Sequence, residues 1–297
     1  MHTCKVPPLP KLRLYRINTG SCNGCDVELA ATEAITRFGL DRLGLSFTAD
    51  PTQADLVLIT GPLTVSSREK VLAEYAEVPD PKITVLIGVC PISGGAFRDS
   101  YAVVAPLDEF VPVDLNIPGC PPRPQAIVAG IAKAVQLWRG GEHPPVSPGP
   151  EEGSLTENLR GRMRYRAEAC VGCRICQHVC AGGAIRFDEE EAGLGFTLWH
   201  NSCLFCGMCS HYCPTGALAP TREWDLAHRQ AEKYRQVEKG VVPRIPCSAC
   251  GVPMLPVVPE LMKKGYRALS AETARLQTLC SECRQVRSLE GVKRCTT

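Results

Sequence analysis

The chain has 297 residues, 44% of them hydrophobic and 22% charged, so it can bury a full hydrophobic core and is long enough for two domains. Its formal net charge of +2 is too small to indicate a polyanionic partner, and no dense run of Lys and Arg contains interleaved aromatic residues. We therefore expect no nucleic acid among the partners of this protein.

The sequence contains 18 cysteines, and most of them recur as C-x-x-C pairs, which place two thiols on one short loop. Disulfide scaffolds are usually short secreted chains with a signal peptide. Residues 1–20 lack an apolar segment and a small-residue cleavage site, so we expect no secretory signal. The apolar runs are far shorter than the roughly 20 residues of a membrane helix, and we expect no direct membrane span. This composition favours reduced thiols that bind metal.

Strand-like and helical segments alternate from the start of the chain to residue 139. They are, in chain order, strand 12–18, helix 26–38, strand 56–60, strand 83–88 and helix 123–138. This alternation is typical of a mostly parallel sheet with helices on its faces. We expect residues 1–139 to form an α/β domain with a flavodoxin-like, mostly parallel sheet.

Four cysteines of this domain follow extended segments. They are Cys22, Cys25, Cys90 and Cys120. The loops that follow parallel strands meet at the carboxyl edge of a sheet. Four thiolates brought together there would complete the ligand set of one 4Fe-4S cluster. A lone free cysteine is usually a buried apolar residue, so the metal interpretation depends on all four acting together.

Residues 140–154 are rich in proline and glycine and have no apolar periodicity, which predicts a linker. The module expected after it, over residues 155–223, contains two runs of the form C-x-x-C-x-x-C-x-x-x-C. The two runs indicate an internal repeat of one short metal-binding unit, and we expect a ferredoxin-like domain with two 4Fe-4S clusters.

In two-cluster ferredoxins the first three cysteines of a run bind one cluster and the fourth binds the other. The ligand sets predicted in this way are Cys170, Cys173, Cys176 and Cys213 for one cluster, and Cys203, Cys206, Cys209 and Cys180 for the other. The second run ends in Cys-Pro, whereas the first ends in Cys-Ala, which removes a helix-starting proline but no ligand. Two zinc sites are the alternative, but a repeated four-cysteine run favours iron–sulfur clusters.

A tail is expected over residues 224–297, with a charged helical stretch at 224–238. Two C-x-x-C pairs in the tail predict a small zinc-ribbon-like metal site with four thiolate ligands. The ligands are Cys247, Cys250, Cys280 and Cys283. Zinc is the first choice, a single rubredoxin-like iron is the alternative, and the metal is expected to fold the tail. Cys4 and Cys295 have no partner spacing and are interpreted as non-ligands.

Three segments of the first domain carry a family resemblance: GSCNGCDVEL at 20–29, GVCPISGG at 88–95 and PGCPPRP at 118–124. Through them residues 11–139 resemble the small subunit of the energy-converting (group 4) nickel–iron hydrogenases, which is related to the 20 kDa subunit of respiratory complex I. The repeat and tail that follow are similar to the two-cluster polyferredoxin subunit of formate-hydrogenlyase-type complexes. The polypeptide looks like a fusion of two neighbouring subunits.

The resemblance implies an electron-transfer subunit with three 4Fe-4S clusters, the proximal one lying beside a nickel–iron site on a separate large subunit. The ligands of that proximal cluster would be Cys22, Cys25, Cys90 and Cys120. Other hydrophilic and membrane subunits are implied, on the cytoplasmic face of the membrane. The implied electron donor or acceptor is a ferredoxin or a carrier that serves formate or CO dehydrogenase. Glu28 would pass protons near the proximal cluster; an ordinary glutamate stabilised by the helix dipole is the alternative.

The small subunit of complex I has adjacent cysteines at its first ligand position, whereas Asn23 and Gly24 separate the first two cysteines here. This departure favours a hydrogenase over a quinone reductase. Two alternatives stay open. One is a connector subunit of a complex-I-like or hydrogenase-related quinone or ferredoxin oxidoreductase that lacks nickel. The other is a zinc-stapled scaffold without catalytic function.

Overall fold

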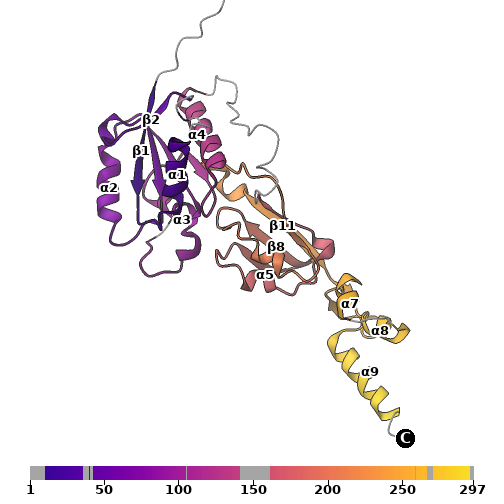
Figure 1. Cartoon of the computed structure of the whole chain (residues 1–297). Helices are drawn as coiled ribbons and strands as arrows, with labels where there is room; N and C mark the ends of the chain where they lie inside the picture. The colour runs from indigo at the N-terminus through magenta and orange to yellow at the C-terminus, as the bar shows by residue number, and fades with distance from the viewer. Residues whose placement is uncertain are drawn as a thin grey trace, which may run out of the picture.

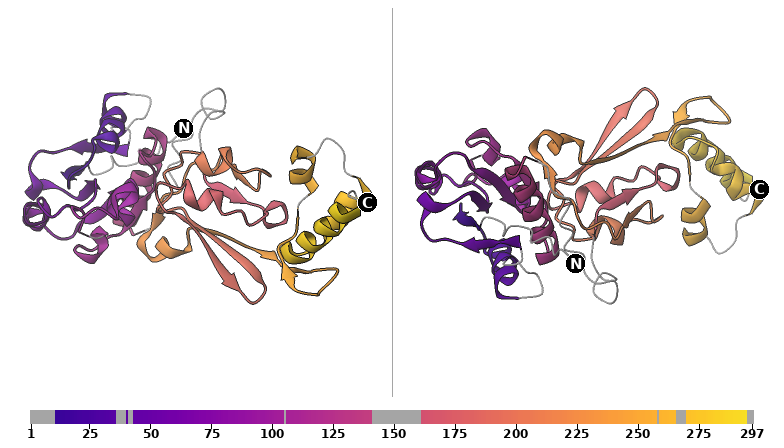
Figure 2. Two further views of the ribbon diagram at one scale, coloured as in Figure 1. Left: turned by 90° about the horizontal axis from the view of Figure 1, so that it is seen from below. Right: turned by 90° about the horizontal axis from the view of Figure 1, so that it is seen from above.

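The computed structural model describes residues 11–35, 40, 43–104, 106–140, 161–257, 259–265 and 270–294. An α/β domain, a ferredoxin-like module and a C-terminal tail lie in a row (Figure 1, Figure 2). Residues 141–154 of the expected linker, Cys4 and Cys295 lie outside the described residues. In the described part of the chain, every helix is too short or too polar to cross a bilayer.

The α/β domain is built on a six-stranded sheet with strand order β10-β5-β4-β3-β1-β2. Five of these strands run parallel. They are β1 (Leu12–Asn18), β2 (Leu45–Phe47), β3 (Leu56–Thr60), β4 (Ile83–Ile87) and β5 (Leu115–Ile117). The sixth, β10 (His228–Arg229), comes from beyond the ferredoxin-like module and pairs antiparallel with β5. The mostly parallel α/β fold predicted from the sequence is confirmed.

Helices cover both faces of this sheet. They are α1 (Gly24–Ala34), α2 (Arg68–Glu77), α3 (Val89–Ser93) and α4 (Pro124–Trp138), with short 3-10 turns at η2 (Pro51–Gln53), η3 (Gly95–Phe97) and η4 (Leu107–Glu109). Alternate residues of β3 face opposite layers. Leu56 and Leu58 pack in the core that contains α1 and α4, whereas Val57 and Ile59 pack in the core that contains α2 and α3. Both faces are covered, which is why residues 56–59 are all apolar and the whole strand is buried.

The ferredoxin-like module contains two small sheets. One has the order β11-β8-β7 and the other pairs β6 with β9. The elements are β6 (Met163–Tyr165), η5 (Ala167–Ala169), α5 (Ile175–His178), β7 (Ile185–Glu190), β8 (Gly193–Trp199), α6 (Met208–His211), β9 (Leu218–Pro220) and β11 (Val237–Pro243). The repeat extends to the backbone: Arg174 before α5 and Gly207 before α6 are both left-handed, with φ of 59° and 79°.

The segment between this module and the tail differs from the expectation. Residues 224–238, expected as a charged helix, form β10, the 3-10 helix η6 (Gln230–Arg235) and the start of β11. The prediction of a charged helix was wrong because the segment lies between the α/β domain and the ferredoxin-like module, where Lys233 is only 2% exposed. Since β10 extends the α/β sheet and β11 extends the ferredoxin sheet, the segment fastens these two parts together.

The tail contains a short hairpin and three helices. They are β12 (Ile245–Pro246), β13 (Pro253–Met254), α7 (Pro259–Gly265), α8 (Ala271–Leu276) and α9 (Ser281–Arg294). Of the tail residues beyond Pro243 whose burial is described, Cys247 and Leu279 are the buried ones. Within these described residues the tail has a small hydrophobic core, and Leu255 packs against the core of the ferredoxin-like module.

Candidate iron–sulfur and metal sites

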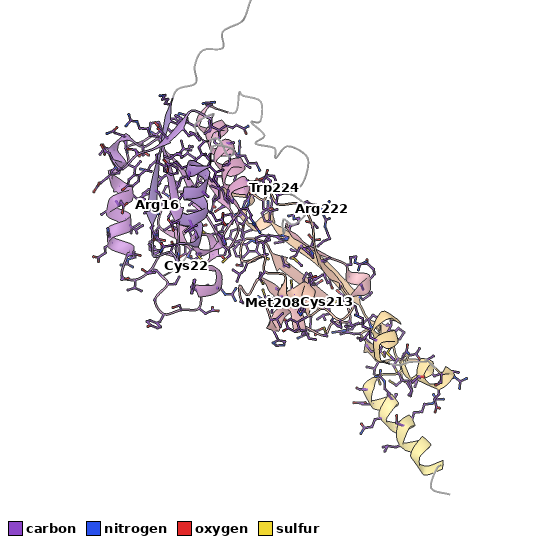
Figure 3. The ribbon with its side chains drawn as sticks, in the orientation of Figure 1. Arg16, Cys22, Met208, Cys213, Arg222 and Trp224 are labelled. Atoms are coloured by element: carbon purple, nitrogen blue, oxygen red, sulfur yellow. The ribbon has the colours of Figure 1, made fainter. Side chains whose placement is uncertain are left out.

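The four cysteines of the α/β domain come together at the carboxyl edge of its parallel strands. Cys22 lies in the loop after β1, and Cys25 lies in the first turn of α1. Cys90 lies in α3, just after β4, and Cys120 follows β5. The Cys25 thiol is close enough to the other three for each of them to raise its pKa. Figure 3 labels Cys22 at the end of this domain and Cys213 in the ferredoxin-like module.

The surroundings of these thiols suit a positively charged centre. Burial, followed by the charge of the neighbouring thiols, raises the pKa of Cys25 and raises the pKa of Cys90 to about 11. Thiolates gathered in such a site need a cation beside them, and cluster iron would supply that charge. Gly88, with φ of +91°, leaves room for the sulfur, because a Cβ at this position would lie 2.6 Å from the Cys25 Sγ atom. The residues therefore fit a cluster.

Asp26 fixes the loop that carries the first two cysteines. Its carboxylate is 9% exposed and accepts hydrogen bonds from Arg16 at 2.6 Å and from Thr60 Oγ1 at 3.0 Å. Its second oxygen accepts from Ser21 Oγ, and from Asn18 Nδ2 at 3.3 Å. Sequence reasoning missed this residue, because an acidic residue in the first turn of a helix is ordinary. The sequence signal that could have identified Asp26 is its position directly after the candidate ligand Cys25.

The two cysteine runs of the ferredoxin-like module line two separate cavities. One cavity is lined by Cys170, Cys173, Cys176 and Cys213. The other is lined by Cys180, Cys203, Cys206 and Cys209. Each run sends its fourth cysteine to the cavity of the other run, so the structure groups the thiols in the two crossed sets. That each set binds a 4Fe-4S cluster stays a prediction.

Backbone N–H groups point at equivalent sulfur atoms in both halves of this module. In the first half, Gly172 donates to Cys170 Sγ at 3.4 Å and Ala184 donates to Cys180 Sγ at 3.2 Å. In the second half, 33 positions later, Phe205 donates to Cys203 Sγ at 3.4 Å and Ala217 donates to Cys213 Sγ at 3.2 Å. Such donors stabilise thiolates and tune the potential of a bound cluster. The cavities therefore offer four sulfurs and matched donors.

Burial also changes the pKa of several thiols in these two cavities. It raises the pKa of Cys176 to about 12, with a further rise from the nearby Cys170 and Cys173 thiols. It raises the pKa of Cys203 to about 12 and that of Cys209 to about 11. Against the effect of its burial, backbone and Thr215 hydrogen bonds lower the pKa of Cys213 instead. The thiols whose pKa is raised need a cation to bind as thiolates, and cluster iron would supply it.

A cavity of about 630 Å³ lies between the α/β domain and the ferredoxin-like module, and Cys120 and Cys206 both line it. Burial raises the pKa of Cys120, and the Cys22 and Cys206 thiols raise it further. Glu28 and Arg123 line the same cavity. The set that contains Cys206 is therefore the ferredoxin set that faces the α/β site. The junction is also held by Arg98, whose Nη1 donates to the Gly182 carbonyl at 2.8 Å.

The tail forms a different kind of site. The Sγ atoms of Cys247, Cys250, Cys280 and Cys283 all lie within 4.8 Å of one another. Among the described residues, this is the one group of His, Cys, Asp and Glu side chains compact enough for a single metal ion. Cys247 and Cys250 lie in the β12–β13 turn, Cys280 precedes α9, and Cys283 lies in the first turn of that helix. The structure thus assembles the four tail cysteines that the sequence pairs.

Two regions of the chain match known protein families. Residues 22–134 match the family described as NADH ubiquinone oxidoreductase, 20 Kd subunit, and residues 169–217 match the 4Fe-4S dicluster domain. The family matches thus include the candidate cysteines of the α/β domain and of the ferredoxin-like module. The tail cysteines lie outside both.

The chain is similar to subunits of oxidoreductase complexes. It is 44% identical to the probable membrane-bound hydrogenase subunit mbhJ of Pyrococcus furiosus over 148 residues, which are 48% of this chain and 84% of that protein. It is 40% identical to formate hydrogenlyase subunit 7 of Escherichia coli over 176 residues, 56% of this chain and 68% of that protein. A solved structure of the archaeal membrane-bound sulfane sulfur reductase is similar with a TM-score of 0.39 and 36% identity, over 44% of this chain and 73% of that chain.

Proposed function

The chain belongs to the family of the NADH ubiquinone oxidoreductase 20 Kd subunit, and on that premise we propose that it is an electron-transfer subunit of a membrane-associated nickel–iron hydrogenase. The relatives named as hydrogenase and formate hydrogenlyase subunits support this proposal. The proposed complex reduces protons or oxidises hydrogen at a nickel–iron site on a partner large subunit. Group 4, the energy-converting class, is the class that we propose.

One observation carries the proposal: three cysteine sets follow one another through the chain, and Cys120 of the first set and Cys206 of the second line the same cavity. We assign a 4Fe-4S cluster to each set, and each cluster, when bound, takes up and releases one electron. The order would run from the α/β set, through the set with Cys206, to the set with Cys213. The protein's part is to hold the thiolates, donate backbone hydrogen bonds to them and keep water away.

The α/β set is open on one side, which supports a partner there. Cys22 is exposed, although the domain buries Cys25. Val27 of α1, beside this set, is 67% exposed. We propose that the large subunit with the nickel–iron site covers this face. The electron donor or acceptor, such as a ferredoxin or a carrier for formate or CO dehydrogenase, would dock at the ferredoxin-like module. The complex would lie on the cytoplasmic face of the membrane, with other hydrophilic and membrane subunits.

Glu28 has a place that suits proton transfer. It lines the cavity shared by Cys120 and Cys206, together with Arg123 and Gln125. We propose that its carboxylate passes protons at this cavity. The Glu28→Gln variant is expected to lose most hydrogen turnover while its iron content is unchanged. Full turnover in that variant, with Glu33→Gln on the exposed side of α1 as the control, would remove this role.

A second candidate function is favoured by the name of the matched family itself. In that candidate the chain connects clusters in a complex-I-like quinone or ferredoxin oxidoreductase whose large subunit lacks nickel. The two candidates share the cysteine sets and differ in the chemistry of the partner. The spacing of the first two cysteines, with Asn23 and Gly24 between them, favours the hydrogenase.

The deciding experiment is copurification of the intact complex without oxygen, followed by metal analysis and assays. The proposal expects stoichiometric nickel in the partner subunit and hydrogen evolution from a reduced low-potential donor. Quinone or ferredoxin reduction without nickel would favour the second candidate. Protein without iron and sulfide would favour a scaffold stapled by zinc.

A further inference from the structure

The tail requires an explanation for its fold, because few of its residues with described burial are buried. Beyond Pro243, the buried residues among those whose burial is described are Cys247, at 4% exposure, and Leu279, at 3%. On the helix α9, Val286 and Leu289 are 59% and 57% exposed. So few buried side chains contribute little against the conformational entropy of ordering the described hairpin and helices. A cross-link between the tail cysteines would supply further stability.

The four tail cysteines have the geometry of one tetrahedral ion. A metal–sulfur bond of about 2.3 Å in a tetrahedral site separates the sulfurs by roughly 3.8 Å, and the Cys250 and Cys280 Sγ atoms lie 3.7 Å apart. Backbone N–H groups support the sulfurs, as the Cys280 N–H donates to Cys247 Sγ at 3.2 Å. A four-iron cluster needs more space between its ligands, because an iron atom stands at each ligated corner.

From this geometry we infer that Cys247, Cys250, Cys280 and Cys283 bind one zinc ion, and that this ion folds the tail. Zinc fits better than iron because Cys250 is exposed and two other ligands are only partly covered, so an iron centre here would meet water and oxidants. Zinc has no redox chemistry and tolerates such exposure. The inference does not depend on the proposed hydrogenase function, since the tail site shares no ligand with the three cluster sets.

The test uses the full chain, purified without oxygen, with zinc and iron measured per chain. Wild-type protein is expected to hold one zinc, which Cys250→Ser and Cys283→Ser lose while the cluster absorbance stays unchanged. Trypsin is expected to cut the tail of both variants at least tenfold faster than the tail of the wild type. Ala249→Ser, between the first two ligands, is the matched control and should keep both zinc and protease resistance.

Three results would overturn this inference. They are a wild-type chain without zinc, a tail site that holds iron instead, and variants that keep both the zinc and the resistant tail. Loss of cluster absorbance in a variant would show general misfolding. In that case, zinc is extracted from the wild-type chain by a chelator and the same proteolysis is measured. Faster cleavage of the tail after extraction would support the inference, and unchanged cleavage would contradict it.

A second inference comes from a difference between the two halves of the ferredoxin-like module. Tyr165 ends β6, is 8% exposed and stacks on Phe196 with ring centroids 3.8 Å apart. Its hydroxyl is buried, and the neighbour close enough to hydrogen-bond to it and so raise its pKa is the sulfur of Cys170. Tyr165 lines the cavity of Cys170. Since a buried hydroxyl without a partner is costly, sulfur in that cavity is the expected partner.

The other half has no such donor. The residue 33 positions after Tyr165 is Leu198, which is 1% exposed and lines the second cavity. The two cavities therefore share their cysteines and backbone donors but differ in one hydroxyl. Hydrogen bonds to sulfur stabilise the more negative, reduced state of a cluster and so raise its potential.

We propose that the Tyr165 hydroxyl donates a hydrogen bond to the sulfur of the cluster bound by Cys170, Cys173, Cys176 and Cys213. This donor gives that cluster a higher potential than its counterpart. Tyr165 is a positioning and tuning residue, and the proposal requires iron–sulfur clusters in both cavities but not a hydrogenase partner. If cluster assembly itself fails, the iron count reports that failure separately from the potential.

The test is a redox titration of Tyr165→Phe, followed by electron paramagnetic resonance. One cluster is expected to become harder to reduce by about tenfold in its equilibrium constant, which is about 59 mV for one electron. The other clusters in the same molecule serve as internal controls, and Tyr101→Phe, at a tyrosine of the α/β domain that is 98% exposed, should shift none. Unchanged potentials in Tyr165→Phe would refute the hydrogen bond, and a shift of all the clusters would assign Tyr165 a structural role only.

Discussion

The Nζ atom of Lys233 lies 2.6 Å from the Asp108 carboxylate, and this ion pair joins the segment after the ferredoxin-like module to the α/β domain. The Lys233 side chain is 2% exposed and that of Asp108 is 16% exposed. Gln230 Nε2 donates to the same carboxylate oxygen at 2.6 Å. Asn201 Nδ2 and Trp199 Nε1 both donate to the Lys233 carbonyl. The junction that sets the spacing of the cysteine sets is therefore polar and buried.

Removing one partner of this pair is expected to loosen the junction. Asp108→Asn leaves the Lys233 ammonium buried without its counter-charge, and such a loss costs about 3 kcal/mol of unfolding free energy. Denaturant unfolding measures this loss, together with faster proteolysis around residues 224–236. Asp99→Asn is the matched control, because Asp99 pairs with Arg98 while its side chain is 88% exposed, and it should cost less than about 0.5 kcal/mol. Equal effects of the two substitutions would contradict this role of the pair.

Asp26→Asn tests whether the carboxylate network holds the first cysteine loop. An amide has one acceptor oxygen and carries no charge, so the hydrogen bonds from Arg16, Thr60 and Ser21 cannot all be kept. We expect a loss of about 2 kcal/mol and a lower occupancy of the α/β cluster, with the two ferredoxin clusters retained. Iron per chain and cluster spectra give the result. Glu33→Gln, exposed on the same helix, should change neither.

The crossed grouping of the ferredoxin cysteines predicts that a substitution in one run disturbs the cluster of the other run. Cys180→Ser is expected to disturb the cluster held by the second run, although Cys180 belongs to the first run. Cys213→Ser is expected to disturb the cluster held by the first run. Spectra that distinguish the two clusters, by potential or by relaxation, check both variants. Damage confined to the run that contains the substitution would overturn the crossed assignment.

The junction is also expected to weaken in acid through His228. Burial lowers the pKa of this histidine below its usual value, although the Leu226 carbonyl that accepts from Nδ1 at 2.8 Å opposes the shift. Nε2 then accepts from Asn201 Nδ2 at 3.2 Å, and protonation would destroy that bond. Lys133 and Lys233 also disfavour the charged ring, whereas Glu232 favours it.

Because the folded protein lowers the pKa of His228, acid destabilises the fold. Below pH about 6.5 the unfolded chain binds a proton at His228 that the folded chain does not, so stability falls as the pH falls towards the folded pKa. Thermal unfolding between pH 7.5 and 5.5 should show this fall in the wild type. His228→Gln should be less stable at pH 7.5 and show a shallower slope. A variant with the slope of the wild type would assign the acid sensitivity to other groups.

Local sequence patterns predict much of this architecture. The β3 strand is predicted at Leu56–Thr60 because a run of four apolar residues followed by a threonine needs no distant information. The cysteine sets of the ferredoxin-like module follow from spacing, since each run closes one tight loop. The position of Cys90 and Cys120 at the ends of β4 and β5 follows from the geometry of parallel sheets.

The remaining features depend on contacts that local patterns do not contain. A lysine such as Lys233, in a charged segment, suggests a solvated helix, yet Asp108, far away in the sequence, makes its burial possible. The two-residue strand β10 exists because the edge of β5 is there to pair with it. Asp26 and Tyr165 act through their surroundings, which only the folded chain brings together.

We propose that three sets of four thiolates hold three clusters, which connect a donor to a partner subunit. Cubane clusters can be counted in the full chain purified under strict exclusion of oxygen, from iron, sulfide and integrated paramagnetic signals of the reduced protein. We expect three 4Fe-4S clusters, one of which disappears when Cys25 is replaced by serine. Two or fewer clusters in the wild-type chain would contradict it.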